Sequence, residues 1–254
     1  MKFYILYGGV LFNPDKSRIT PGHGVNELIK IPVPMYVIDH PDGLVVVDAG
    51  LSYEHFPDWM KPDTLDEPEC RIDRQLVKLG YDPDSVKYVI MTHLHCDHAG
   101  AMENLPKATF IVRREELKEA WFPKDRNVGG CGYIFDDYKN TRFFNYLELE
   151  DNVEYDVFGD GSVICIDTKG HTRGHQSVIV NLPNSGKIVI AADAASLPEN
   201  LDLMVPPGRG IYSTECGLKA IERLRAMRDE GALVLMGHCP KQWEELKKAP
   251  EFYD

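Results

Sequence analysis

The chain has 254 residues, of which 43% are hydrophobic and 27% are charged, a balance typical of an ordinary globular protein. Its 28 basic and 40 acidic residues give a formal net charge of -12, which disfavours a broad electrostatic contact with nucleic acid or with an anionic membrane. No apolar run approaches membrane-spanning length, and the N-terminus lacks the pattern of an export signal. We therefore expect a cytoplasmic protein with a small-molecule substrate, no nucleic-acid partner and no membrane partner; the sequence does not indicate an oligomeric state.

Short apolar runs alternate with helical patterns along the chain. The runs are rich in β-branched or aromatic residues, and most are bounded by Gly, Pro, Asp or Asn, which predicts strands. The predicted strands cover residues 2–7, 34–38, 44–48, 87–92, 109–112, 162–167, 176–182, 187–193 and 232–237. Amphipathic helices are predicted over 71–79, 114–122 and 214–231, with Gly80 and Gly231 as the stops of the first and last, and Thr214 as an N-cap.

Strands in both halves, with helices between them, predict two sheets packed face to face and helices outside, which is a four-layer αββα sandwich. We expect one domain over residues 1–254. Residues 8–30 and 51–70 are rich in Gly, Pro and polar residues and are predicted to be long loops. An aromatic-rich insertion at about 121–146 is either a local aromatic core or, in part, the wall of an apolar pocket over the active site. The six scattered cysteines are expected to be free thiols.

Four side chains that can bind metal follow the predicted strand over 87–92. They are His93, His95, Asp97 and His98. In an extended segment, side chains two residues apart point the same way, so the first three could share one side of the chain. Imidazole and carboxylate are standard ligands of zinc and related divalent ions.

Three further apolar runs end close to a possible ligand. These ligands are His171, Asp193 and His238. Seven groups exceed the need of one catalytic zinc ion, which takes three protein ligands and water. The number indicates two ions that share one carboxylate and a solvent species between them.

The segment "THLHCDHAG" matches the H-x-H-x-D-H signature of the metallo-β-lactamase superfamily. The later segments "KGHTRGHQS", "AADAA" and "MGH" follow in the order and approximate spacing of the other ligand motifs of that superfamily. Over most of its length the chain most resembles the N-acyl-homoserine lactonase group, through "IPVPMYVI", "VVVDAG" and the terminal "KKAPEFY" as well as the ligand motifs.

The resemblance implies an αββα sandwich with a dinuclear site at one edge. Carried over by position, it assigns one ion to His93, His95 and His171, the other ion to Asp97, His98 and His238, and the bridging position to Asp193. Asp48 matches a carboxylate that supports the ligand loop from behind, although an Asp that forms a turn before Gly50 is an equal alternative. His175 matches a position that does not bind metal.

The implied activity is the opening of a lactone ring, with N-acyl-homoserine lactones as substrates and quorum quenching as the result. Two divalent ions would lower the pKa of a bridging water, and the resulting hydroxide would attack the carbonyl. Asp97 would act as the proton shuttle. Zinc is the expected metal, and iron, manganese or cobalt would also suit these ligands.

One position departs from the lactonase pattern. The lactonases carry a Tyr three residues after the bridging Asp, whereas Ser196 stands there in this chain. Tyr212, or an aromatic hydroxyl of the insertion, could act in its place as a substrate contact. A hydrolase of another lactone, of a thioester or of a phosphoester therefore remains an alternative.

Other functions of similar sites fit less well. A thioesterase of the glyoxalase II type needs a further helical region for glutathione, and only a short tail follows His238. A nuclease would need a basic surface, and a secreted β-lactamase would need an export signal. Flavodiiron proteins hold two irons on the same ligand set but carry a fused flavin domain. A structural metal module would have a closed site built with Cys and His.

Overall fold

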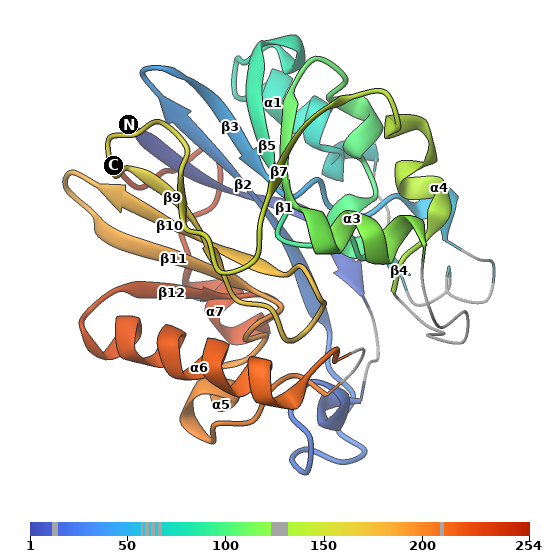
Figure 1. The fold of residues 1–254 in the computed structure, drawn as a ribbon, viewed down its shortest axis with the longest axis vertical. Coiled ribbons are helices and arrows are strands. Elements are labelled where there is room, and N and C mark those ends of the chain that lie inside the picture. Colours follow the sequence, from blue (N-terminus) through green and yellow to red (C-terminus); the bar gives the residue numbers. More distant parts are fainter. Residues whose placement is uncertain are drawn as a thin grey trace.

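The computed structural model describes residues 1–11, 15–56, 58, 61, 64–65, 68–122, 132–208 and 211–254. Two twisted sheets pack against each other in the middle of the molecule, and helices cover both outer faces (Figure 1). The seven-stranded sheet has the order β4-β1-β2-β3-β5-β6-β7, and the five-stranded sheet has the order β12-β11-β10-β9-β8. The predicted four-layer αββα fold is confirmed.

The strands of the first sheet are β1 (Lys2–Leu11), β2 (Ile31–His40), β3 (Gly43–Val47), β4 (Thr64–Leu65), β5 (Val86–Ile90), β6 (Thr109–Arg113) and β7 (Asn145–Leu149). Those of the second are β8 (Tyr155–Asp156), β9 (Val163–Asp167), β10 (Gln176–Leu182), β11 (Gly186–Ala192) and β12 (Leu233–Met236). Strands β3, β5, β6 and β7 pair in parallel, as do β11 and β12. Because parallel strands end at the same edge of a sheet, the residues that follow them can meet there.

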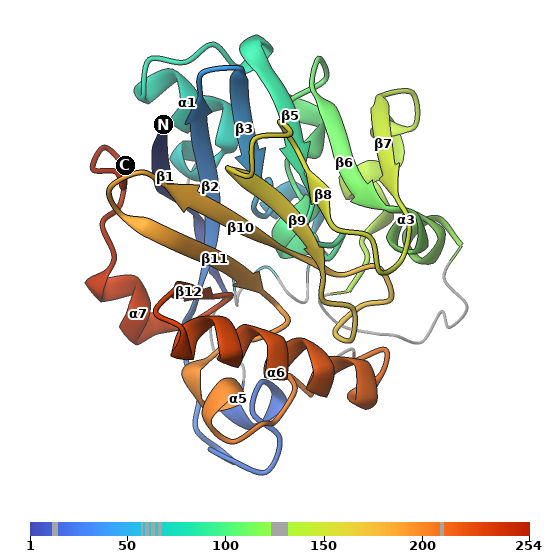
Figure 2. The same cartoon turned by 60° about the vertical axis from the view of Figure 1, so that its left-hand side comes forward.

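Helices α1 (Ile72–Lys78), α3 (Arg114–Trp121) and α4 (Phe135–Tyr138) lie on the side of the seven-stranded sheet (Figure 1). Helices α5 (Pro198–Asp202) and α6 (Thr214–Asp229) cover the five-stranded sheet (Figure 2). Two short helices, α2 (Cys96–Ala99) and α7 (Pro240–Glu245), each follow a strand. Single 3-10 turns occupy Lys16–Arg18, Tyr53–His55, Pro68–Cys70, Pro83–Ser85, Met102–Asn104 and Lys139–Thr141. No helix in the described part of the chain is long and apolar enough to cross a membrane.

The central strands are buried on both faces, which explains their nearly continuous apolar sequences. In β2, Tyr36 and Ile38 join the cluster between the sheets, whereas Met35 and Val37 join the cluster beneath α1 and α3. In β11, Ile190 faces the middle layer. Successive side chains of a strand point to opposite faces, so one apolar run supplies two layers of the core.

The nine predicted strands and the three predicted helices are present, with some corrected ends. Strand β1 continues to Leu11, so residues 8–11 are not a loop: Gly8 and Gly9 form an irregularity between Tyr7 and Val10 after which the pairing resumes. The N-cap of α6 is Ser213 rather than Thr214, because the Ser213 hydroxyl accepts a hydrogen bond from a backbone N–H in the first helical turn.

The elements that the sequence analysis missed are all short. They are β4, β7, β8, α2, α4, α5 and α7, and a run of two to six residues gives too few periods of a pattern for detection. The ends of the segment at about 121–146 overlap regular elements, since its first residue belongs to α3 and its last two belong to β7. Its residues 123–131, and several of those predicted to form the loop at 51–70, lie outside the described residues.

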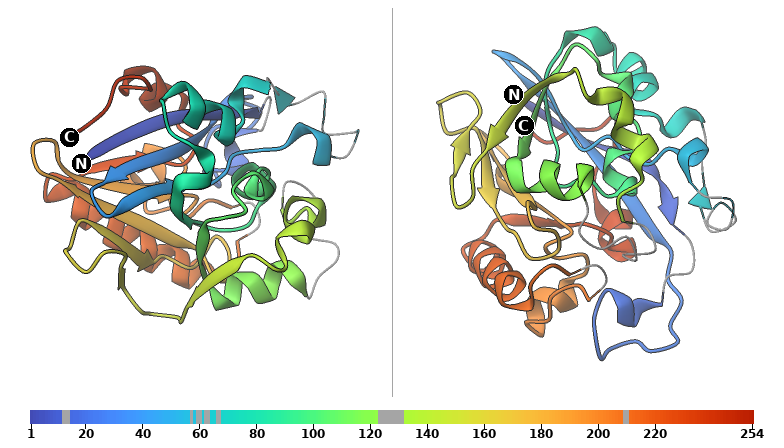
Figure 3. Two further views of the ribbon diagram at one scale, coloured as in Figure 1. Left: turned by 90° about the horizontal axis from the view of Figure 1, so that it is seen from above. Right: turned by 45° about the vertical axis from the view of Figure 1, so that its right-hand side comes forward.

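The two ends of the chain lie close together, as both views of Figure 3 show. Phe3 and Tyr253 exchange two backbone hydrogen bonds of 2.8 and 2.9 Å. The five cysteines within the described residues form no disulfide with one another, and four of them are buried. Cys131 lies outside the described residues.

Candidate metal centre

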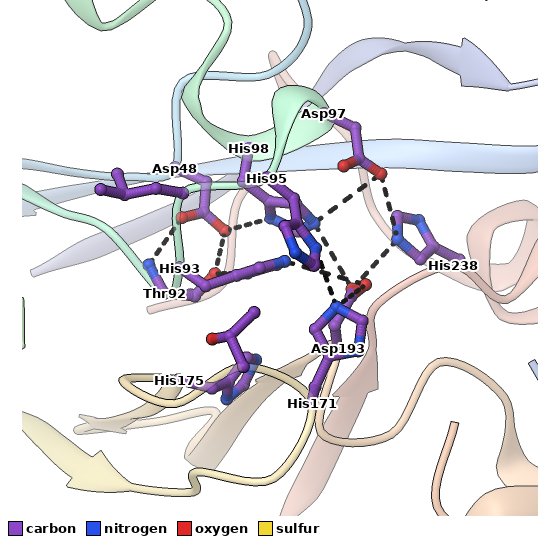
Figure 4. Close-up of polar contacts among 12 residues, drawn as sticks. Asp48, Thr92, His93, His95, Asp97, His98, His171, His175, Asp193 and His238 are labelled. Carbon is purple, nitrogen blue, oxygen red and sulfur yellow. Dashed lines mark hydrogen bonds and ion pairs between the residues drawn. The ribbon is translucent and has the colours of Figure 1, made fainter. Parts of the chain in front are cut away.

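Side chains from four segments converge at one edge of the sandwich (Figure 4). They form three buried groups within which the ligand atoms lie no more than 4.8 Å apart. The groups are His93, His95 and His171; Asp97, His98 and His238; and His93, His98 and Asp193. We call the first the triple-histidine group and the second the Asp97 group. The structure thus brings together all seven side chains that the sequence analysis named as ligands.

Asp193 lies between the triple-histidine group and the Asp97 group. Its Oδ2 is 3.3 Å from Nε2 of His171 and 4.0 Å from Nε2 of His93. Its Oδ1 is 3.0 Å from Nε2 of His238 and 3.4 Å from Nε2 of His98. Each oxygen of this carboxylate therefore faces a different group, which is the arrangement that a carboxylate shared by two cations requires.

The backbone around Asp193 departs from regular strand geometry. The pairing of β11 with β12 shifts register between Ile190 and Ala192, and Ala192 has a φ of 47°. This left-handed conformation is unfavourable for alanine, so the surrounding structure must hold it. A Cβ on Gly237 would lie 2.6 Å from the carbonyl oxygen of Ala192 and 2.8 Å from Oδ1 of Asp193. A glycine before His238 is therefore needed for the close approach of the two strand ends.

Hydrogen bonds turn the Nε2 atoms of two imidazoles toward the centre. Nδ1 of His238 donates to the carbonyl oxygen of Pro32 at 2.9 Å, and Nδ1 of His98 donates to Oδ2 of Asp48 at 2.8 Å. Asp48 also accepts from the backbone N–H and the hydroxyl of Thr92, at 2.8 and 2.7 Å. The loop after β3 is thereby joined to the loop after β5, and Asp48 lies where a carboxylate that orients a metal ligand would lie.

Burial lowers the pKa of two imidazoles of the triple-histidine group. The pKa of His171 falls to about 3, mainly because the side chain is buried. The pKa of His93 falls well below its ordinary value because the ring is buried beside His98 and His95. Both rings are therefore neutral at pH 7, and neutral imidazole is the form that binds metal.

Carboxylates have the opposite effect in the Asp97 group. Burial acts to lower the pKa of His98 and of His238, but nearby carboxylates, including Asp193, raise both above their ordinary value. Burial acts to raise the pKa of Asp193, yet the surrounding imidazoles, His238 foremost, hold it well below its ordinary value. The same concentration of negative charge that stabilises protonated imidazoles also favours a divalent cation.

The donor atoms fit a divalent metal. Nε2 of His93 is fully buried and has no hydrogen-bond partner within the described residues. Leaving a buried polar atom unpaired costs about 1–3 kcal/mol, so such atoms are rare unless they serve another purpose. Coordination of a cation would satisfy this lone pair, and sets of imidazole and carboxylate ligands accept zinc, iron, manganese or cobalt.

Glu116, beside the predicted ligands, was missed by the sequence analysis, and Tyr133 was predicted only as one aromatic residue of the segment at 121–146. Glu116, on α3, is fully buried and lies behind the ligand loops, where burial raises its pKa and four hydrogen bonds act to lower it. The ring of Tyr133 lies 4.9 Å from that of His95, and its hydroxyl donates to Glu116 at 2.9 Å. The only signal of Glu116 in the sequence was its position on the same helix face as Ala120. That face is buried, so an apolar residue is expected where Glu116 stands.

Other candidates from the sequence lie in different surroundings. His175 is in none of the three groups; its Nδ1 lies 2.9 Å from the hydroxyl of Thr168, and burial lowers its pKa to about 3. Ser196 is buried next to the site, and its carbonyl oxygen accepts from the backbone N–H of His238. Tyr212 is half-exposed, with its ring 5.0 Å from the guanidinium of Arg173. Contact of Ser196 or Tyr212 with a substrate stays a prediction.

The described part of the aromatic segment at 121–146 supports both interpretations of it. Trp121, Phe135 and Tyr138 pack edge to face with ring centroids 5.5–5.8 Å apart, which is a local aromatic core. Tyr133 instead lies against His95. Ile134 packs against the buried apolar cluster that contains Cys96. Tyr133 and Ile134, near the start of the described stretch 132–146, therefore reach the site.

Residues 29–238 match the family model described as "Metallo-beta-lactamase superfamily". This chain belongs to the metallo-beta-lactamase superfamily. The superfamily and the buried groups of His and Asp together indicate an enzyme, a hydrolase that uses divalent metal ions. The family resemblance that the sequence analysis drew is confirmed.

Relatives of this superfamily member include several lactonases. The chain is 37% identical to the N-acyl homoserine lactonase AttM of Rhizobium radiobacter, over 100% of this chain and 98% of the relative. It is 28% identical to the N-acyl homoserine lactonase AiiA of Bacillus thuringiensis subsp. kurstaki, over 93% and 91% of the two chains.

Solved structures of similar fold agree with these relatives. One is an N-acyl homoserine lactone hydrolase with the product N-hexanoyl-L-homoserine bound at its catalytic metal centre. It has a TM-score of 0.85 and 26% identity, and the match covers 99% of this chain and 98% of that one. A quorum-quenching N-acyl homoserine lactone lactonase matches with the same TM-score of 0.85 at 27% identity, over 99% and 98% of the chains.

Proposed function

We propose that residues 1–254 form one hydrolase domain that opens the ring of N-acyl homoserine lactones, with two zinc ions as its cofactors, and that it acts in quorum quenching. The main support is the position of Asp193 between the triple-histidine group and the Asp97 group. Such a shared carboxylate matches a dinuclear site, and the relatives that match the whole chain are named lactonases.

Each ion has its own set of residues in this proposal. The triple-histidine group would hold one ion, the Asp97 group would hold the other, and Asp193 would contact both. When bound, two divalent ions supply Lewis-acid activation of the lactone carbonyl and of the attacking water. The chain itself contributes the geometry of the ligands and the transfer of protons.

Asp97 is proposed to transfer the proton that ring opening requires. It lies in the first turn of α2, and its Oδ2 is 3.5 Å from Nε2 of His238 and 3.9 Å from Nε2 of His98. Because Oδ2 faces these two imidazoles and would contact the ion, Oδ1 would be the oxygen that takes up the proton and donates it to the departing ring oxygen. Asp97→Asn keeps the shape of the side chain but not this capacity, so kcat should fall about 10²–10⁴-fold at saturating metal. Turnover near that of the unchanged protein, at equal metal content, would show that Asp97 is not the shuttle.

The surroundings of Asp97 are compatible with a substrate that has an apolar part. Its neighbour Cys96 belongs to a buried apolar cluster that also contains Phe56 and Leu197 and packs against Ile134. Polar ligand atoms on one side and apolar side chains on the other are typical of small-molecule sites. The side chains of this cluster are themselves buried, so the acyl chain of the proposed substrate rests mainly on the names of the relatives.

A substrate panel tests the proposal. Metal-loaded protein is assayed with N-hexanoyl- and N-decanoyl-homoserine lactone, an unsubstituted lactone, a thioester and a phosphodiester, and the products are identified by mass spectrometry. We expect ring-opened acyl homoserine from the first two. Hydrolysis of the phosphodiester without hydrolysis of any lactone would contradict the proposal. Hydrolysis of the unsubstituted lactone alone would show that the substrate is a lactone without an acyl chain. The cytoplasmic location stays a prediction, which fractionation of cells would test.

A further inference from the structure

We infer that Glu116 is a positioning residue that holds both halves of the triple-histidine group in place and so sets the affinity of that group, but not of the Asp97 group, for its cation. The inference rests on the proposed two-metal site. It adds a residue that is not itself a ligand, on a helix outside the ligand loops.

The carboxylate of Glu116 joins three segments that are far apart in the sequence. Its Oε1 accepts from the backbone N–H of Leu94 at 2.9 Å and from the hydroxyl of Tyr133 at 2.9 Å. Its Oε2 accepts from the hydroxyl of Thr172 at 2.6 Å and from the backbone N–H of Gly174 at 3.0 Å. Glu116 has an exposed fraction of 0%, so water does not compete for these hydrogen bonds.

These contacts fall next to the ligands of one group only. Leu94 stands between His93 and His95, and Thr172 directly follows His171. The Nε2 atom of His171 and the Nδ1 atom of His95 lie 3.0 Å apart, so the relative position of the two loops fixes the distance between these donors. One carboxylate thus fixes the spacing of all three ligands.

The Asp97 group is held by other residues. His98 donates to Asp48, and His238 donates to the carbonyl oxygen of Pro32. Neither of these partners contacts Glu116 through a hydrogen bond in the described part of the chain. Loss of the Glu116 contacts should therefore affect the two cation positions unequally.

The loop that carries His171 lies directly on the first turn of α3. A Cβ on Gly174 would lie 2.3 Å from the backbone nitrogen of Glu116 and 2.5 Å from its Cβ. These distances are shorter than any normal contact, so only glycine allows the loop to approach this closely. The short distance places the N–H of Gly174 within reach of the carboxylate.

Glu116→Gln is the sharpest test because the change is nearly isosteric. Each oxygen of Glu116 accepts from one hydroxyl and one backbone N–H, and a backbone N–H cannot become an acceptor. Whichever way the amide of Gln turns, its NH2 group meets the N–H of either Leu94 or Gly174. The variant must therefore release one of the two ligand loops.

The measurement is metal binding rather than activity. Protein stripped by chelation is titrated with zinc in competition with a chelator of known affinity, which resolves the two equivalents. We expect Glu116→Gln to weaken one equivalent about 10–100-fold, the usual effect of removing a partner that orients a ligand, and to leave the other unchanged. His95→Ala, which removes a ligand of the triple-histidine group, identifies which equivalent belongs to that group.

Two variants serve as controls. Glu119→Gln makes the same change of charge on the same helix. Glu119 is half-buried, and its carboxylate has no hydrogen bond to the described residues of either ligand loop. This variant should therefore leave both equivalents unchanged. Asp48→Asn removes the partner of His98 and should weaken the other equivalent.

The outcomes separate this inference from the proposed function. Unchanged binding in Glu116→Gln, or an equal loss at both equivalents together with a lower melting temperature, would overturn the positioning role. If Glu116→Gln does not fold, Thr172→Val removes one donor without unpairing a backbone N–H and should still weaken the same equivalent, though less. Two equivalents that respond as expected in a protein without lactonase activity would refute the substrate and leave the role of Glu116 intact.

Discussion

Asp48→Asn is expected to weaken metal binding without replacing any ligand. The Asp48 side chain is 1% exposed, and its two oxygens accept three hydrogen bonds, one of them from Nδ1 of His98. In the variant, the amide oxygen can keep the bond from the N–H of Thr92. The amide NH2 then faces Thr92 Oγ1, which can accept, and Nδ1 of His98, which can accept only if it loses its proton.

The cost follows from the tautomer of His98. A neutral ring that accepts at Nδ1 carries its proton on Nε2, and Nε2 is the atom that faces Asp193, 3.4 Å away. A protonated nitrogen cannot bind a cation, so the proton must first move from Nε2 to Nδ1 of His98. This move breaks the hydrogen bond that the amide NH2 of Asn donates to Nδ1. Loss of such an orienting partner lowers metal affinity about 10–100-fold, which corresponds to about 1.4–2.7 kcal/mol.

The assay compares zinc affinity by chelator competition in Asp48→Asn, in Asp48→Glu and in the unchanged protein, with circular dichroism to verify folding. We expect one of two equivalents to be weakened in Asp48→Asn. Affinity equal to that of the unchanged protein at both equivalents, in a folded variant, would refute the argument that Asp48 selects the tautomer of His98.

Three further predictions concern the strand ends, the pH dependence of stability and the effect of the metal. Gly237→Ala places a Cβ 2.6 Å from the carbonyl oxygen of Ala192, so we expect urea denaturation to show a loss of about 1–3 kcal/mol of stability. Metal titration should show weaker binding through Asp193. An unchanged midpoint of urea denaturation would mean that the strand ends separate freely. Burial lowers the pKa of His175 to about 3 from an ordinary value of 6.5, so the unfolded chain takes up this proton first and stability falls as the pH drops below 6.5. Between pH 7 and pH 5 this one group accounts for a loss of about 2 kcal/mol in the free energy of unfolding. In urea denaturation of protein stripped of metal, His175→Gln should therefore lose about 2 kcal/mol less stability over this pH range than the unchanged protein. Equal losses of stability would show that His175 is not buried in its neutral form. Zinc at about 100 times its dissociation constant should stabilise protein stripped of metal by about 2.7 kcal/mol per site, which is measured as a rise in melting temperature. If zinc does not change the melting temperature, the site is not one that forms only in the folded chain.

The layers of the fold and the ligand positions were predictable from the sequence because both depend on local patterns. Runs such as residues 187–193 are apolar on both faces and then end in a polar side chain, so one pattern marks the strand and the site. The short elements could not be predicted, because α2 has four residues and β8 has two, and tertiary contacts rather than periodicity stabilise them.

The residues that support the site were harder to find than its predicted ligands. Asp48 was predictable only through a family resemblance, since an Asp before Ala49 and Gly50 also fits a turn, and its φ of 58° is in the left-handed region. Glu116 gave almost no signal, because Leu94 is brought to it by the pairing of β5 with β6, and Thr172 and Gly174 by the packing of the two sheets. Sequence periodicity describes one element at a time and cannot show such contacts.

Two cations, held on either side of Asp193, are proposed to make this chain a lactonase. The most direct measurement follows N-hexanoyl-homoserine lactone ring opening while zinc is added stepwise to protein stripped of metal. We expect no turnover in stripped protein and activity that rises until two equivalents are bound for each chain. Full activity after complete chelation, or activity complete at one equivalent, would contradict this proposal.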